Sequence, residues 1–220
     1  MKAVASSGEL DYQWAPVTAI SGIAGGIAYA FIGIASHSTS NIIVVPLSFA
    51  FAFGITVGSI GLYHILGGPR GSRLALIAAV ANVIAAAQLL AMIMVQQSVW
   101  ATVDQPDAAL RAVWWGLDVA WDLYLGTGTI LFALSMFRRR GLGAWLAVPG
   151  LLISGPFLIF NIATFPQPPD VAGLVDLGPV VGLWYLAVFV RLGASAVLLG
   201  RRKRRSTAAL EGAAGPDWAG

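Results

Sequence analysis

Charged residues are scarce in this sequence. Only 10% of the 220 residues are Asp, Glu, Lys or Arg, and 58% are hydrophobic. A typical soluble domain carries about 25% charged residues, because charged side chains cover its surface. The composition therefore excludes most soluble folds. It also excludes disorder, because disordered chains are poor in apolar residues.

Several reactive side chains are absent or rare. The sequence has no cysteine and two histidines, His37 and His64. Disulfides, thiolate metal sites and cysteine nucleophiles are therefore excluded, and a three-histidine zinc site cannot be built. The only lysines, Lys2 and Lys203, lie outside the apolar segments, which excludes the buried Schiff-base lysine of a microbial rhodopsin. We expect no metal and no cofactor.

Six apolar segments are long enough to span a membrane, which takes about 20 residues. None shows the strict alternation of a membrane β-strand. The segments cover about residues 14–36, 42–66, 74–99, 113–137, 142–163 and 180–200. The sequence therefore predicts an all-α fold, a polytopic transmembrane helical bundle of six spans. Residues 1–205 would form one domain, and residues 206–220 a disordered cytoplasmic tail.

Basic residues gather in alternate connections between the spans. Ten of the thirteen follow the second, fourth or sixth span, namely Arg70, Arg73, Arg138, Arg139, Arg140, Arg201, Arg202, Lys203, Arg204 and Arg205. Because positive loops stay in the cytoplasm, both termini are predicted to be cytoplasmic, in the inner membrane of a bacterial cell. We interpret the last five as an anchor to anionic lipid and expect no nucleic-acid partner.

Small residues and a proline-rich loop are further features. Glycines spaced four residues apart, such as Gly22 with Gly26 and Gly54 with Gly58, predict close helix packing. The connection from Asn161 to Pro179 holds four prolines. It is either a lid over a pocket or a rigid connector between neighbouring helices.

Two acidic residues interrupt the fourth span. Asp118 and Asp122 lie one turn apart, on the same helix face as Trp115. A carboxylate in hydrocarbon costs at least about 2.5 kcal/mol, so both should face the bundle interior and have partners. Arg191 in the sixth span is predicted to lie at the same depth and to bind one or both. The candidates for binding a ligand or proton are Asp118, Asp122, Arg191, Trp115, Trp121 and Trp184.

Three functions remain open for this cluster. The first is binding or transport of a small or lipidic molecule at a midplane Asp/Arg site between the fourth and sixth spans. The second is an intramembrane enzyme whose buried aspartic acid acts on an apolar, isoprenoid-like substrate. The third is a non-catalytic accessory subunit of a larger membrane complex. The expected partners are the lipid bilayer, the small or lipidic ligand, and another membrane protein or a second copy of the chain. The ion pair could also be purely structural.

Overall fold

The computed structural model describes residues 14–35, 41–67, 72–102, 106–137 and 142–213. These ranges hold six α-helices and no strand. The helices are α1 (Ala15–Ala35), α2 (Asn41–Gly67), α3 (Arg73–Thr102), α4 (Ala108–Met136), α5 (Gly143–Thr164) and α6 (Gly178–Ala213). Each contains a stretch long and apolar enough to cross a membrane. The predicted all-α, six-span fold is confirmed, and the protein is built to be embedded in a lipid bilayer.

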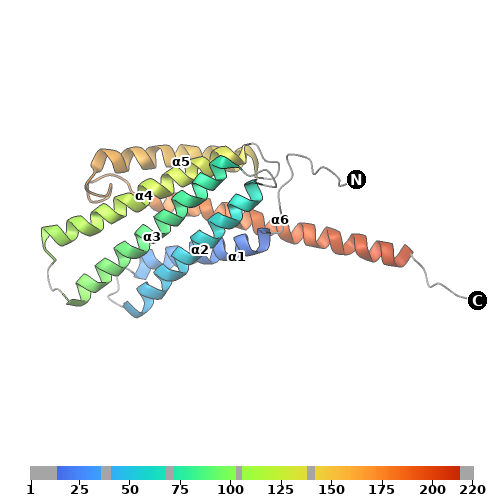
Figure 1. The fold of residues 1–220 in the computed structure, drawn as a ribbon, viewed down its shortest axis with the longest axis horizontal. Helices are drawn as coiled ribbons and strands as arrows, with labels where there is room; N and C mark the ends of the chain where they lie inside the picture. The colour runs from blue at the N-terminus through green and yellow to red at the C-terminus, as the bar shows by residue number, and fades with distance from the viewer. Residues whose placement is uncertain (1–13, 36–40, 68–71, 103–105, 138–141, 214–220) are drawn as a thin grey trace, which may run out of the picture.

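The contacts between the helices form a ring in chain order, and Figure 1 shows this bundle from the side. Each helix packs against the next, and α6 returns to pack against α1, while its contact with α5 is small. We call the end at which α4 and α6 begin the acidic end, because Asp107, Asp170 and Asp176 lie there. The other end, where Arg73 begins α3, is the basic end. The interior of the ring can hold a site only where side chains do not fill it.

Glycines allow α1 and α2 to approach closely. A Cβ atom added at Gly54 would lie 2.6 Å from the Ser21 carbonyl oxygen and 2.7 Å from the Gly25 Cα atom. At Gly58 an added Cβ would lie 2.8 Å from the Phe189 ring, and at Gly22 it would overlap the same ring. The predicted glycine packing is therefore present, although Gly54 faces Gly25. Gly22 and Gly58 leave space for the Phe189 side chain of α6, which packs against α1 and α2.

A network of hydrogen-bonded polar side chains crosses the interior of the helix ring, in the half of the bundle nearer the basic end. The Asn82 amide nitrogen on α3 donates to Ser59 Oγ at 2.9 Å and to the Tyr185 hydroxyl at 2.7 Å. The same hydroxyl lies 3.2 Å from Thr129 Oγ1 on α4. All four side chains are buried. Because buried polar groups need partners, this network fixes the register of α2, α3, α4 and α6.

The sixth helix is longer than predicted. It continues to Ala213 (Figure 1), so residues 206–213 are helical, whereas the sequence analysis assigned them to a disordered tail. The segment contains Ala, Leu and Glu, which favour helix once a helix is already nucleated. Residues 214–220 lie outside the described residues, as does His37.

Candidate functional site at the acidic end

A cavity of about 510 Å³ lies inside the ring at its acidic end. Side chains of α1, α3 and α4, the start of α6 and the α5–α6 loop form its walls, and α2 contributes Val44. Ligand sites in proteins commonly occupy 300–1,000 Å³ and combine apolar walls with a few polar groups. This cavity, which we call the acidic pocket, has both features.

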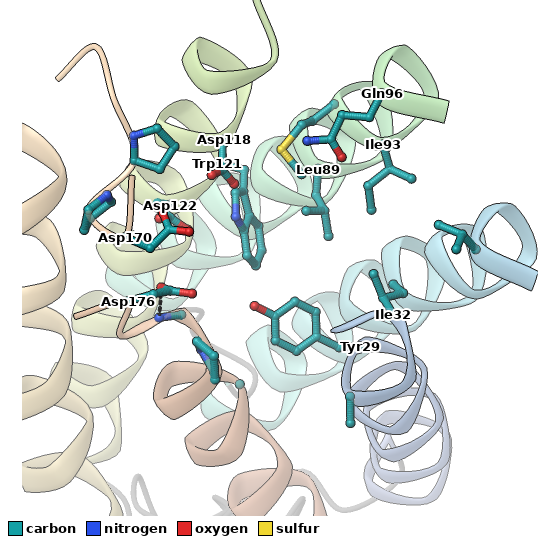
Figure 2. A pocket seen from close by; sticks show the side chains of 18 of the residues that line it. Tyr29, Ile32, Leu89, Ile93, Gln96, Asp118, Trp121, Asp122, Asp170 and Asp176 are labelled. Atoms are coloured by element: carbon teal, nitrogen blue, oxygen red, sulfur yellow. Dashed lines mark hydrogen bonds between the residues drawn. The ribbon is translucent and has the colours of Figure 1, made fainter. Parts of the chain in front are cut away.

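One wall of the acidic pocket is made of carboxylates. Asp118 and Asp122 come from α4, and Asp170 and Asp176 from the α5–α6 loop. Figure 2 shows the four on one side of the cavity. Asp122 is 5% exposed, and the Asn161 amide of α5 lies beside its carboxyl group. No Lys, Arg or His is among the described residues that line the pocket.

The facing wall is apolar and aromatic. Figure 2 places Tyr29 and Ile32 of α1, with Leu89 and Ile93 of α3, across the cavity from the aspartates. The wall also holds a polar side chain, Gln97 of α3, which is 5% exposed. Its amide oxygen has no hydrogen-bond partner among the described residues. The pocket is therefore acidic on one side and apolar on the other.

Aromatic rings close the pocket toward the basic end. The ring centre of Tyr29 lies 5.0 Å from that of Phe51 and 6.0 Å from that of Trp121. The Phe51 and Trp121 rings meet edge to face at 5.9 Å. A much smaller apolar cavity lies against the same three rings, with Tyr185 and Phe189 among its other lining residues. These three side chains, the aromatic floor, separate the two cavities.

The α5–α6 loop forms part of the wall. Pro168 and Pro169 are buried and line the pocket. Backbone hydrogen bonds fold the loop on itself, including Leu174 N–H to the Pro169 carbonyl at 2.7 Å. The loop therefore supplies two of the four pocket carboxylates, as either a lid or a rigid connector would.

The surroundings of Asp176 in the same loop shift the pKa of its carboxyl group. Its carboxylate accepts a hydrogen bond from Gly178 N–H at 2.7 Å. Partial burial raises the pKa of Asp176 above its usual value, the Gly178 hydrogen bond opposes this shift, and the negative charge of Asp170 adds to it. Asp176 therefore binds a proton more readily than a fully solvated aspartate does.

Arg191 does not form the predicted ion pair. Within the described part of the chain, neither Asp118 nor Asp122 has Arg191 as an electrostatic partner, and Arg191 does not line the acidic pocket. The prediction of an Asp/Arg site between α4 and α6 is therefore wrong. It assumed that the two helices begin at the same depth.

The hydrogen-bonded network gives the physical reason. Thr129 and Tyr185 lie at one level, and both helices run from the acidic to the basic end. Asp122 precedes Thr129 by seven residues, and Arg191 follows Tyr185 by six. At about 1.5 Å per residue, these offsets separate Asp122 and Arg191 by about 20 Å along the bundle. The α5–α6 loop, in which Pro168 and Pro169 are buried, starts α6 deeper than α4.

Only one of the three tryptophans predicted for the site lines the acidic pocket. Trp121 lines the acidic pocket, but Trp115 and Trp184 do not. Trp184 packs against α5, where its indole N–H donates to the Leu146 carbonyl at 2.7 Å. An added Cβ at Gly150 would lie 2.8 Å from the Trp184 ring, so glycine makes room for it. Because Arg191 shares the helix face of Trp184, that face turns toward α5 and away from Asp122.

Sequence reasoning missed four pocket residues. Asp170 and Asp176 of the α5–α6 loop, Tyr29 of α1 and Gln97 of α3 were not among the predicted site residues. The signals available were a tyrosine and a glutamine within otherwise apolar segments, at the end of the bundle where the acidic loops lie.

The geometry limits what the pocket can hold. No three carboxylate or histidine side chains of the described residues converge closely enough to hold a metal ion. No family model, curated protein or solved structure matches this chain.

Proposed function

We propose that this membrane protein binds a small organic molecule in the acidic pocket. The observation that carries the proposal is the cavity of about 510 Å³, which combines an apolar wall with several acidic and amide groups. Such groups are costly within a membrane-embedded bundle and are not needed to hold these helices together, because glycine packing and the Asn82 network do so. A binding role explains why they are gathered around a space.

We propose further that binding takes place from the extracytoplasmic side. The positive-inside distribution of the sequence puts the acidic end there. The aromatic floor closes the pocket on the opposite side. A carrier function would require Tyr29 and Trp121 to separate, so that the bound molecule could pass toward the basic end.

A pocket-filling variant tests this function without assuming the charge of the ligand. Ala30 on α1 lines the pocket and is exposed, and Ala24 on the same helix is exposed but does not line it. Three probes of related shape are tetraphenylphosphonium, the uncharged triphenylphosphine oxide and tetraphenylborate. Binding is measured by equilibrium dialysis with the protein in nanodiscs, after subtraction of empty nanodiscs.

We expect saturable binding of at least one probe, strongly reduced by Ala30→Phe and retained by Ala24→Phe. Equal binding by both variants would place the probe outside the pocket. The absence of saturable binding by all three probes would also count against the proposed function.

A further inference from the structure

We propose that the acidic pocket selects organic cations, in which an ammonium or phosphonium centre carries apolar groups. This inference rests on the proposed function and names its ligand class. It concerns the charge of the molecule, whereas the proposed function concerns only whether the pocket is occupied.

The first argument is the charge of the wall. Four carboxyl groups line the pocket and no basic side chain of the described residues lines it with them. Where these carboxyl groups are ionised, their mutual repulsion and lost hydration are compensated by a bound proton or by a positive partner. Arg191 of α6 does not line the pocket and lies near the other end of the ring. A cationic ligand would supply the missing charge.

The second argument is independent of the carboxylates. Gln97 is 5% exposed, lines the pocket, and has an amide oxygen with no partner among the described residues. A buried carbonyl oxygen is costly unless a donor or a positive charge lies against it. Rotation of the Gln97 side chain would bring this oxygen to a ligand in the pocket that carries donors or positive charge.

The third argument comes from the aromatic side chains. Tyr29 and Trp121 form the floor, and Trp100 lines the wall near Gln97. The faces of such rings attract cations, and more strongly when water is excluded. The ring faces also accept the apolar groups of an organic cation, as do Leu89 and Ile93 opposite the aspartates.

Two other ligands that carry a positive charge, a metal ion and a zwitterionic phospholipid, fit the pocket less well. A bare metal ion needs several ligands converging within a short distance, and no such group exists among the described residues. A phospholipid with a choline or ethanolamine head group would carry its phosphate toward four carboxylates. A free organic cation avoids this repulsion.

The test compares the affinities of the three probes for the wild-type protein. We expect tetraphenylphosphonium to bind at least about tenfold more tightly than triphenylphosphine oxide, and tetraphenylborate to bind most weakly, because the shapes are related and the charges differ. We also expect Asp118→Asn and Asp122→Asn each to weaken binding of the cation while leaving that of the uncharged probe within about twofold.

Three outcomes decide between the inference and the proposed function. Binding of the uncharged probe or the anion as tightly as the cation, blocked by Ala30→Phe, would overturn the cation inference and keep the function. No pocket-dependent binding of any probe would overturn both. Cation preference that persists in both aspartate variants and in Asp170→Asn with Asp176→Asn would also overturn the inference.

A competition experiment separates the two sources of a quaternary ammonium group. Phenyltrimethylammonium is a free organic cation, and phosphocholine carries the same charged centre with a phosphate attached. We expect only phenyltrimethylammonium to displace bound tetraphenylphosphonium. Equal displacement by phosphocholine would instead identify a lipid head group as the ligand.

Discussion

The Tyr185 hydroxyl of α6 and Thr129 Oγ1 of α4 are 3.2 Å apart in the buried interior of the ring. Together with the Asn82 hydrogen bonds, this contact aligns two helices that otherwise touch little. Its position keeps Arg191 far from Asp122, and no basic side chain of the described residues lines the pocket with the carboxylates. The charge of the acidic pocket is thus a consequence of how α6 is placed along α4.

Removing the Tyr185 hydroxyl should destabilise the bundle. Tyr185→Phe leaves the Asn82 amide without one of its two acceptors. Hydrogen bonds between membrane helices contribute about 0.5–2 kcal/mol, so we expect a loss of that size. Chemical unfolding in detergent measures it, with Tyr124→Phe, an exposed tyrosine on α4, as the control. Equal stability of the two variants would show that the network does not hold the helices in register.

Adding one methyl group at Gly54 should separate α1 from α2. The new Cβ would lie 2.6 Å from the Ser21 carbonyl oxygen, so backbone must move. Overpacking of this kind costs about 1–3 kcal/mol. Gly116→Ala is the matched control, because nothing lies within 4 Å of its added Cβ. We expect Gly54→Ala to lower the thermal midpoint and Gly116→Ala to leave it unchanged or raise it slightly. The reverse order would refute the close approach.

Neutralising Arg191 should not affect ligand binding. In the ion-pair hypothesis, Arg191→Gln would change the charge of the site as much as a change at Asp122. Because the residues are about 20 Å apart along the bundle, we expect cation affinity within about twofold of wild type. Asp122→Asn, measured in the same dialysis experiment, should weaken it clearly. Similar losses in both variants would restore the predicted Asp/Arg site.

Acidification should weaken cation binding and stabilise the empty protein. The raised pKa of Asp176 means that the folded protein holds a proton there more tightly than the unfolded chain does. Between the usual aspartate pKa and the raised value, stability therefore falls as pH rises, while the negative charge available to a cation increases. Thermal midpoints and tetraphenylphosphonium affinity across pH 3 to 8 test both trends.

The control for this pH experiment is Asp176→Asn. Asp118, Asp122 and Asp170 line the same pocket and are unchanged in the variant. The difference between wild type and variant isolates the contribution of Asp176, and we expect both trends to be smaller in the variant. Identical pH profiles would show that Asp176 does not contribute.

Cysteine labelling should reveal the orientation of the ring. The chain has no cysteine, so single substitutions need no prior removal of native thiols. Gln96 lines the pocket at the acidic end of α3, and Arg73 is exposed at the basic end of the same helix. We expect a membrane-impermeant thiol reagent to label Gln96→Cys in intact cells and Arg73→Cys only after lysis. The opposite pattern would invert the predicted topology.

Composition and periodicity were sufficient to predict the helices and to select the two α4 aspartates as candidate site residues. A bilayer of fixed thickness requires apolar segments of a minimum length, and this requirement is local, so it can be counted along the chain. The cost of a carboxylate in hydrocarbon is also a local property. It directed Asp118 and Asp122 to the interior, and both line the pocket.

The partners of those aspartates were decided by the tertiary structure. A helical wheel gives the face of a residue, but not the neighbour that the face meets nor the depth at which the helix begins. The loop whose Pro168 and Pro169 are buried starts α6 deep in the ring, and the face that carries Trp184 and Arg191 turns toward α5. Asp170 and Asp176 of this loop thereby line the same pocket as the α4 carboxylates, which lie about fifty positions earlier in the sequence.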